Sequence, residues 1–538
     1  MCNIFFISKC NDFPKFEKAL DLGRHRGPDH EGVKRGDDGI LMGHGRLSIL
    51  DLSPNGNQPM TKEDITILFN GEVYNYRELI EEHGLTPKST GDTEVILDLY
   101  LKLGKKCFTE LDGEFAIVIY NKRARQIFAV RDSFGIKPLY YAKTSDNGLI
   151  ISSEIKPILE FIKPVLYHPA FNKLLKFGYP LGDETLFQGI HKFQPGSIYS
   201  CKTWGNIIEV EESIIWESPV KPTQKEMKEL IKVAVIKKTA SDVPISVCLS
   251  GGIDSSIITK YVSEVNPRIK TYTLGFKEDK EQIDLQNARI VSKFFNTDHT
   301  EIIISVEDAL KELPNIIREM EEPSDKGSLI PTYFLSKIVK EKVTLVGEGA
   351  DELFGGYKRH EQIAENFPES EKEYIEKYLD VFSMPTNPRG MMQRNRSGND
   401  YLRFDLVTEI PDYHTNRLDK LFMNRSIEVR VPFLDKKLVS RALGVHYDEK
   451  VPNKKYLRNL FKKDLPKEVI EVKKNAFKIP YHEWVYRKEI KDELYKPNPF
   501  FPKDVVDGIY DQPEGTRNKE RRIWLMYLIK IWHQTFFS

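Results

Sequence analysis

Two glycine-rich segments in the second half of the chain carry residues suited to phosphate chemistry. The first, LSGGIDSS (Leu249–Ser256), follows a short apolar run and precedes a helical pattern. Backbone N–H groups at the start of such a helix bind anions, and glycines let a phosphate approach closely because they lack a Cβ atom. Asp254 offers a carboxylate for a magnesium ion that bridges phosphate oxygens. Because no GKS or GKT follows, the segment predicts a pyrophosphate loop rather than the Walker loop of γ-phosphate transfer.

The second segment, VTLVGEGADELFGGY (Val343–Tyr357), again runs from a strand pattern through glycines into acidic residues. Asp351 could complete a magnesium site with Asp254. Glu348 fits either a general base or a first-turn carboxylate that complements the helix dipole. Lys454, in NKKYLRNLF, fits either a phosphate-binding cation or a lysine on a solvated helix face. Residue types alone leave these alternatives open.

The first half of the chain begins with a different chemistry. Its first residues, MCNIFF, place Cys2 directly after Met1. Removal of Met1 would leave a thiol and an α-amino group on one residue. An α-amine with a reference pKa of about 7.7 to 8.0 can activate that thiol as a nucleophile. On position alone, an ordinary buried thiol in a first strand is the more common interpretation.

The elements that must position these residues differ between the two halves. In the first two hundred residues, GEFAIVIY (Gly113–Tyr120) and QIFAVRD (Gln126–Asp132) flank a charged turn and predict a β-hairpin. After a linker at Ser218–Gln224, an amphipathic helix begins near Met227, and short apolar strands then alternate with helices. This alternation predicts a parallel sheet covered by helices. We therefore expect an antiparallel first domain and an α/β second domain.

Composition restricts the class of protein. A chain of 538 residues with 40% hydrophobic and 30% charged residues is typical of a soluble protein of two or more domains. Lys plus Arg and Asp plus Glu both number 80, so no net field favours nucleic acid or an anionic membrane as partner. The apolar stretch at Ile523–Phe537 is interrupted by Lys530 and His533 and predicts a packing helix rather than a membrane span. The five cysteines form no CxxC pair, and no signal segment opens the chain, so we expect a cytoplasmic protein.

The motifs of the second half resemble the synthetase domain of asparagine synthetases, within the ATP-pyrophosphatase group of α/β folds. The resemblance rests on SGGIDSS, GEGADELFGGY and EVRVPFLDKK (Glu428–Lys437). It implies that ATP is cleaved between its α and β phosphates to make an acyl-adenylate, with Mg²⁺ held by Asp254 and Asp351. It also implies that Lys454 stabilises charge on the phosphates and that Glu348 takes a proton from attacking ammonia. The implied ATP-binding residues are Leu249, Ser250, Gly251, Gly252, Asp254, Ser255, Leu274, Val346 and Gly347.

The first half resembles the class II glutamine amidotransferase domain, an N-terminal-nucleophile αββα sandwich. Behind MCNI stand, in order, RHRGPD, HGRLSILD, FNGEVYNY, STGDTEV and RDSFGIKPLYY. The resemblance implies that Cys2 is the nucleophile and that the Asn70 amide and the Gly71 N–H form the oxyanion hole. Singly these residues have ordinary explanations as turn, surface or capping residues, but their joint order behind Cys2 favours catalysis. The implied glutamine-binding residues are Arg46 for the α-carboxylate, Asp92 for the α-ammonium, and Leu47, Ser48, Ile49, Leu50, Asn70, Gly71 and Glu72.

Together the two resemblances imply an amidotransferase domain at residues 1–210, a linker at 211–224 and a synthetase domain at 225–538. Glutamine hydrolysis at Cys2 would supply ammonia, through a tunnel, to a β-aspartyl-AMP, giving asparagine, glutamate, AMP and pyrophosphate. The segment Glu321–Tyr333 lacks an arginine that some members carry in the acceptor pocket, and offers Asp325 and Ser328 instead. Val346 replaces a serine often found before GEG. A different carboxylate acceptor and a catalytically silent glutamine- or ATP-binding sensor are the alternatives, and a homodimer is compatible with the family.

Overall fold

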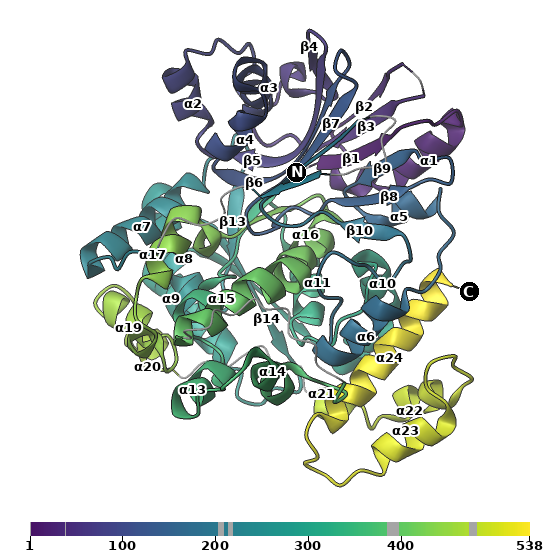
Figure 1. Cartoon of the computed structure of the whole chain (residues 1–538). Coiled ribbons are helices and arrows are strands. Elements are labelled where there is room, and N and C mark those ends of the chain that lie inside the picture. Colours follow the sequence, from purple (N-terminus) through teal and green to yellow (C-terminus); the bar gives the residue numbers. More distant parts are fainter. Residues whose placement is uncertain are drawn as a thin grey trace.

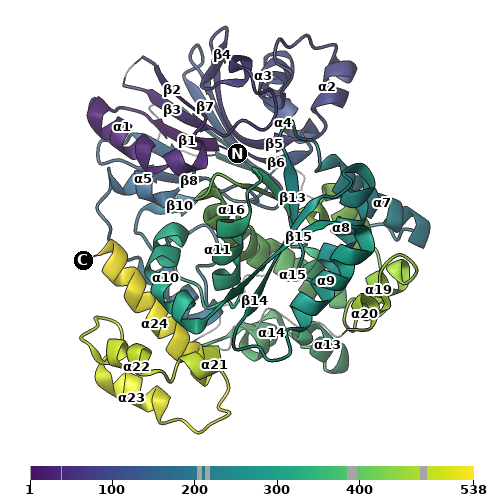
Figure 2. The same cartoon turned by 180° about the vertical axis from the view of Figure 1, so that it is seen from behind.

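The computed structural model describes residues 2–37, 39–202, 209–212, 219–384, 397–472 and 481–537. A strand-rich first half, purple to blue in Figure 1, lies on a larger helix-rich second half. Strand β1 (Cys2–Ile7) begins beside the second half in both views (Figures 1 and 2). The amino end of the chain therefore lies close to the boundary between the two parts.

The first half contains two antiparallel sheets of six strands each among the described residues. Strand β1 shows why they stack. Its side chains alternate in direction, so Ile4 and Phe6 join the core between the sheets while Phe5 and Ile7 join a core on the outer face. The strand order of the first sheet is β10 (Ile190–Lys192), β8 (Tyr140–Lys143), β9 (Leu149–Ser152), β1, β3 (Leu41–Arg46) and β2 (His30–Arg35).

The second sheet repeats this division on β5 (Ile65–Val73). Leu68 faces the first sheet, whereas Ile67 and Phe69 pack in the cluster that contains helix α3 (Asp92–Leu103). Helix α1 (Phe13–Leu22) contributes to the outer core of the first sheet, which completes the predicted αββα order. The predicted hairpin is confirmed as β6 and β7. The strand order is β12 (Glu209–Glu212), β11 (Ser197–Lys202), β7 (Gln126–Arg131), β6 (Gly113–Asn121), β5 and β4 (Met60–Lys62).

The second half is built on a parallel sheet, as the alternating pattern predicts. Helix α7 (Gln224–Lys237) precedes it and buries Met227, Ile231, Ala234 and Val235. Figure 2 shows strands of this sheet with α8 (Ile253–Val265) and α9 (Ile283–Phe295) on one side and α10 (Val306–Met320) and α11 (Leu329–Ile338) on the other. The strand order is β15 (Asp298–Ile304), β14 (Lys270–Phe276), β13 (Ile245–Cys248), β16 (Val343–Leu345) and β17 (Glu428–Arg430).

The chain ends in helix α24 (Lys519–Phe536), which confirms the predicted packing helix. Trp524 and Trp532 are almost fully buried, and the Trp532 Nε1–H donates a hydrogen bond to the Glu321 carbonyl oxygen at 2.8 Å. This helix belongs to the same hydrophobic cluster as Phe5 and Ile7 of β1. In the part of the chain that the structure describes, no helix is both long and apolar enough to cross a membrane.

Buried charges join the two halves. Arg26, which has no exposed surface, lies 3.1 Å from Glu154 Oε1 of the first half and 2.7 Å from Asp419 Oδ2 of the second. Its Nε–H also donates to the Cys2 carbonyl oxygen at 3.1 Å. Because leaving one member of such a buried set unpaired is costly, these contacts fix the position of Cys2 relative to the second half.

Candidate active sites

The first centre forms where β1, β3 and β5 lie side by side. Cys2 is the first residue of β1 and is opposite Arg46 in the antiparallel register. Burial raises the pKa of the Cys2 thiol, so the thiol is neutral at pH 7 and needs a base to become a nucleophile. The backbone nitrogen of Cys2 donates to Asn70 Oδ1 at 2.8 Å. Met1 lies outside the described residues, so its removal, which would turn this nitrogen into the predicted base, stays a prediction.

Asn70 and Gly71, which are predicted to form an oxyanion hole, lie on β5, and Asn70 contacts the first residue of β1. Since Asn70 Oδ1 accepts from the Cys2 nitrogen, the amide is held in one orientation. Its Nδ2 is buried and has no hydrogen-bond partner among the described residues. Gly71 has φ +148°, and a Cβ there would lie 2.0 Å from the Glu114 carbonyl oxygen, so no other residue fits. A buried donor without a partner, beside a thiol, is suited to an oxygen that becomes negatively charged.

Arg46 ends β3 and begins the segment Arg46–Asp51, which we call the glutamine loop. Its guanidinium donates to the carbonyl oxygens of Leu50 at 3.2 Å, Ser53 at 2.7 Å and Asp51, and to Asn57 Oδ1 at 2.8 Å. The side chain therefore holds the loop in place. Its predicted contact with a glutamine carboxylate would have to replace some of these bonds.

The carboxylates of Glu72, Asp92 and Glu428 influence one another where this centre meets the second half. Burial raises the pKa of Asp92 to about 6, although its carboxylate accepts from the Val73 N–H at 2.8 Å. Burial and the neighbouring Asp92 and Glu428 raise the pKa of Glu72 well above its usual range. Arg430, from β17, lies 3.4 Å from Glu72 Oε1. An incoming ammonium group would lower the pKa of Asp92 again, which is compatible with its predicted role.

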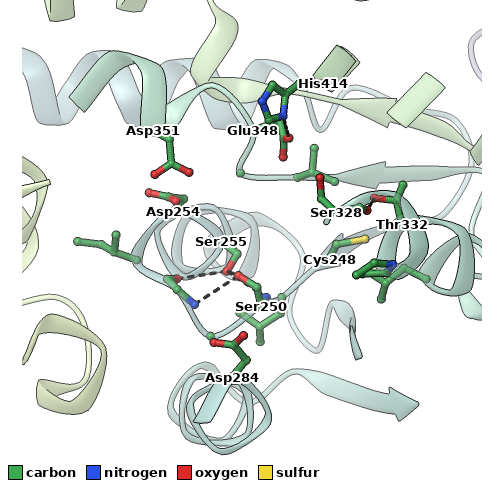
Figure 3. A pocket seen from close by; sticks show the side chains of 18 of the residues that line it. Cys248, Ser250, Asp254, Ser255, Asp284, Ser328, Thr332, Glu348, Asp351 and His414 are labelled. Carbon is green, nitrogen blue, oxygen red and sulfur yellow. Dashed lines mark hydrogen bonds and ion pairs between the residues drawn. The ribbon is translucent and has the colours of Figure 1, made fainter. Parts of the chain in front are cut away.

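The second centre is a cavity of about 430 Å³ in the second half (Figure 3). The carboxyl ends of the neighbouring strands β13 and β16 both lead into it. The Leu274 side chain is fully buried in a core cluster and is not among the residues that line the cavity, where Tyr272 and Thr273 lie, so its implied contact with ATP stays a prediction. The other predicted residues of this centre all line the cavity: Leu249, Ser250, Gly251, Gly252, Asp254, Ser255, Val346, Gly347, Glu348, Asp351 and Lys454.

The loop after β13 has the form that an anion site requires. Gly251 has φ +74°, and a Cβ there would lie 2.6 Å from the backbone nitrogen of Ala288. Ser255 Oγ accepts from the Ser250 N–H at 3.2 Å and lies 3.0 Å from Ser250 Oγ, which closes the loop (Figure 3). Helix α8 starts directly after Gly252, so its first N–H groups and its dipole are available to a bound phosphate.

Asp254 and Asp351 face each other across the mouth of the phosphate loop (Figure 3). Lys454 forms ion pairs with both, its Nζ lying 2.7 Å from Asp351 Oδ1. Burial alone lowers the pKa of Lys454, but the two carboxylates outweigh burial and raise it. Two opposed carboxylates are the hard oxygen donors that Mg²⁺ prefers, so these residues fit the predicted metal.

Glu348 lies against two cations that the sequence does not reveal. Its Oε1 is 2.5 Å from His414 Nδ1 and 2.7 Å from Arg417 Nη2. Burial alone raises the pKa of Glu348, but Arg417 and His414 outweigh it and lower the pKa to about 2. His414 is shifted the other way: burial lowers its pKa, and Glu348 and neighbouring carboxylates raise it to about 9. Glu348 is therefore an anion at neutral pH and a weak base.

His414 also lies with Glu352 and Glu409 in a group whose potential ligand atoms are within 4.8 Å of one another. Its members are paired with other groups in this structure. The neighbouring carboxylates raise the pKa of His414, so the imidazole is protonated at neutral pH and pairs with Glu348. Glu409 is already paired with Lys326 and Arg359, each at 2.7 Å.

The acceptor segment Glu321–Tyr333 contributes one of its two candidate residues to the cavity. Ser328 lines it, and its hydroxyl lies 2.8 Å from the Tyr413 hydroxyl and also contacts Arg417. Asp325 is 2% exposed and forms an ion pair with Arg521 instead. The segment has no arginine but places Lys326 at the cavity, and Arg359 and Arg417 line the cavity from other parts of the chain. No local pattern could have found them, since Arg417 is 69 positions from Glu348.

Comparisons with known proteins also divide the chain into two parts. The family model described as "Glutamine amidotransferase domain" matches residues 1–210, and that described as "Asparagine synthase" matches residues 226–534. The chain is 30% identical to "Asparagine synthetase [glutamine-hydrolyzing] 1" of Bacillus subtilis (strain 168), over 95% of this chain and 92% of that protein. It is 32% identical to "Probable asparagine synthetase [glutamine-hydrolyzing]" of Dictyostelium discoideum, over 84% and 77%.

Among solved structures, the chain is similar to a glutamine phosphoribosylpyrophosphate amidotransferase from B. subtilis, with a TM-score of 0.31 and 13% identity over 65% of this chain and 77% of that chain. The two family models together span most of the sequence, and the match to the B. subtilis relative covers 92% of that protein. The chain belongs to the asparagine synthetase family, with an amino-terminal glutamine amidotransferase domain.

Proposed function

We propose that this enzyme makes asparagine from aspartate, with glutamine as nitrogen donor and ATP as energy source. The observation that carries the proposal is the unpartnered buried Asn70 Nδ2 beside Cys2, in a chain that also holds a pyrophosphate-type cavity. Each centre matches one half of the reaction. The names of the relatives support the same overall activity.

In the first half-reaction, the α-amine of processed Cys2 takes the thiol proton, and the thiolate sulfur attacks the side-chain carbonyl carbon of glutamine. Asn70 Nδ2 and the Gly71 N–H stabilise the negative oxygen of the tetrahedral intermediate. The C–N bond then breaks, the nitrogen takes the proton and leaves as ammonia, and water hydrolyses the thioester to glutamate. Asp92 receives the α-ammonium group of the substrate.

In the second half-reaction, a β-carboxylate oxygen of aspartate attacks the α-phosphorus of ATP, and pyrophosphate leaves. The N–H groups of the loop after β13 bind the phosphate oxygens, and Lys454 stabilises the charge that grows on the leaving pyrophosphate. Asp254 and Asp351 would hold Mg²⁺, which when bound neutralises phosphate charge. Lys454 exchanges its carboxylate partners for phosphate oxygens as the nucleotide enters.

Ammonia from the first centre then attacks the carbonyl carbon of the adenylate, and AMP leaves. Glu348 accepts a hydrogen bond from the attacking nitrogen and stabilises the positive charge that develops there. Because its pKa of about 2 makes it a weak base, Glu348 passes the proton that the nitrogen loses to water or to the phosphate of the departing AMP rather than keeping it. His414 and Arg417 hold the carboxylate in place.

The acceptor is the part of the proposal that a single experiment decides. Lys326, Arg359 and Arg417 line the cavity and suit a substrate with two carboxylates. Purified protein would be given magnesium-ATP and glutamine with aspartate, or with glutamate as the longer homologue. Mass spectrometry would follow AMP, pyrophosphate and the amide. Asparagine with equimolar AMP supports the proposal, whereas glutamate and ammonia without aspartate-stimulated AMP point to a different carboxylate.

We also propose that the enzyme works in the cytoplasm. Its five cysteines are all unbridged and four of them are buried, which is typical of a reducing compartment. Assembly as a homodimer stays a prediction, which sedimentation of the purified protein would test.

A further inference from the structure

The glutamine loop packs against the second half of the molecule as well as the first. Leu47 and Ile49, 3% and 2% exposed, belong to the hydrophobic cluster of the synthetase half. That cluster includes Met227 of α7, Val247 of β13 and Leu345 of β16. The loop that is predicted to bind glutamine is thus packed in the core that supports the nucleotide cavity.

Asp242 binds the same loop through two hydrogen bonds. It lies in the turn between α7 and β13, and its N–H donates to the Ile49 carbonyl oxygen at 3.0 Å. Its carboxylate accepts from the Asp51 N–H at 2.9 Å. On its other side, the Asp51 carboxylate accepts from Thr90 at 3.0 Å and from Ser89 at 2.6 Å, both in the first half. The end of the loop is therefore held between the two halves, with Asp242 as the contact from the synthetase half.

A second contact holds the beginning of the loop. The Asp29 carboxylate accepts from the Ser48 N–H and from Lys342 Nζ, both at 2.7 Å. Lys342 directly precedes β16 in the synthetase half. Ser48 is thus connected to β16 through Asp29, as Asp51 is connected to β13 through Asp242.

Arg430 fixes the turn that carries Asp242. Its Nη1 donates to the carbonyl oxygens of Lys238 at 2.9 Å and Ala240 at 2.6 Å. Its own carbonyl oxygen accepts from the Val346 N–H at 3.0 Å, beside the second nucleotide loop. Since Arg430 has no exposed surface and also lies near Glu72, the turn cannot move without disturbing buried charges.

These contacts meet on two short neighbouring strands. β13 and β16 are parallel, and Ile245 is opposite Val343 in the register. Asp242 and Lys342 lie before the amino ends of the two strands, and both nucleotide loops follow their carboxyl ends. β13 has four residues and therefore spans roughly 13 Å. It connects the turn that contains Asp242, which binds the backbone of the glutamine loop, to the loop that is predicted to bind phosphate.

We propose that Asp242 is a positioning residue for glutamine binding and that, supported by Lys342, it couples glutamine affinity to the nucleotide state of the synthetase half. The inference rests on the proposed function. A nucleotide that shifts or rigidifies the loops after β13 and β16 changes the position of the glutamine loop through these contacts. Because binding free energies are coupled reciprocally, glutamine then changes nucleotide affinity by the same factor.

The test compares D242A with D242N in the full-length enzyme. In D242N the amide oxygen can still accept from the Asp51 N–H, whereas D242A removes the acceptor. D492A is the matched control, because Asp492 is an exposed residue of helix α22 (Lys488–Tyr495) far from the loop in sequence. For each protein, glutamine hydrolysis is measured with and without magnesium-ATP and aspartate, and synthesis is measured with ammonia in place of glutamine.

We expect D242A to raise KM for glutamine about tenfold, with kcat within about twofold of the original, since the lost bond has a charged acceptor. D242N and D492A should stay within about twofold of the original KM. Ammonia-dependent synthesis should be unchanged in all three variants. In the unsubstituted enzyme, ATP and aspartate should change KM for glutamine several-fold, and in D242A this response should be lost.

Three results would overturn the inference: an unchanged KM for glutamine in D242A, an equal loss of ammonia-dependent synthesis, or no effect of ATP and aspartate on KM in the unsubstituted enzyme. If D242A does not fold, K342A replaces it, with an expected rise in KM of about threefold because its ion pair is partly exposed. An unsubstituted enzyme that hydrolyses no glutamine would instead contradict the proposed function, which is a separate failure.

Discussion

The two active centres differ in whether their polar and charged groups already have partners before a substrate binds. In the first centre the Cys2 thiol is held neutral by burial, and a buried donor, Asn70 Nδ2, has no partner among the described residues. In the nucleotide cavity the charges are paired with one another before any substrate arrives, as Lys454 is with Asp254 and Asp351. The first centre therefore offers a vacant donor to its substrate, whereas the second must exchange ion pairs when ATP binds. The difference predicts that substitutions in the two centres have separable effects.

The largest separation is expected for C2A. Removing the nucleophile should lower glutamine hydrolysis and glutamine-dependent synthesis by about 10⁴-fold or more. Ammonia-dependent synthesis should be retained, because no atom of Cys2 takes part in adenylate formation. Both activities would be measured on the same preparation. Loss of ammonia-dependent synthesis in C2A would contradict the existence of two independent centres.

The converse substitution is K454A. Synthesis from either nitrogen source should fall by roughly 10³-fold, because charge on the leaving pyrophosphate loses its cation. Glutamine hydrolysis should continue. K455A is the matched control, since Lys455 is the exposed neighbour on helix α19 (Lys455–Phe461). A similar loss in K455A would show that the helix, rather than the Lys454 charge, is responsible.

A smaller effect sharpens the account of the first centre. In N70A, kcat for glutamine hydrolysis should fall by about 10²-fold, the usual loss for one oxyanion donor. Substrate affinity should change less than kcat, because the donor acts mainly on the charged intermediate. Steady-state kinetics of hydrolysis would separate the two constants. A change confined to KM would assign Asn70 to substrate binding instead.

The smallest effect concerns stability. The Glu348 pKa is lowered to about 2, so its contribution is present above its unfolded value near 4.5 and is lost as the pH falls toward 2. The His414 pKa is raised to about 9, so its contribution is present below its unfolded value near 6.5 and is lost as the pH rises through 9. The pair therefore stabilises the fold most between about pH 4.5 and 6.5.

Thermal unfolding of H414Q would check this window. Its melting temperature should lie furthest below that of the unsubstituted enzyme near pH 5.5, and the difference should shrink toward pH 9. H446Q is the control, because His446 is an exposed residue outside the cavity. A difference that does not vary with pH would mean that His414 stabilises the fold through packing rather than charge.

The parts that local chemistry determines could be predicted from the sequence. Glycines after short apolar runs located both nucleotide loops, and the alternation of strands and helices predicted the parallel sheet. The αββα order of the first half was implied by its resemblance to the class II amidotransferase domain. Long-range contacts could not be predicted in this way. His414 and Arg417 reach Glu348 from helices far along the chain, and the direction of Leu274 into the core depends on which face of β14 is covered. Arg46 was predicted to bind the glutamine α-carboxylate, but the carbonyl groups that surround its guanidinium depend on the closed shape of its own loop and could not be foreseen.

The shared core of the two chain ends has a consequence for synthesis on the ribosome. Phe5 and Ile7 of the first strand lie in one hydrophobic cluster with Trp524 and Trp532 of the last helix. At 5–20 residues per second, roughly half a minute to two minutes separate the emergence of these segments. During that time the outer face of the first sheet lacks part of its cover. The nascent amidotransferase half is therefore expected to expose apolar surface until helix α24 has emerged, and chaperones are expected to bind it during that interval.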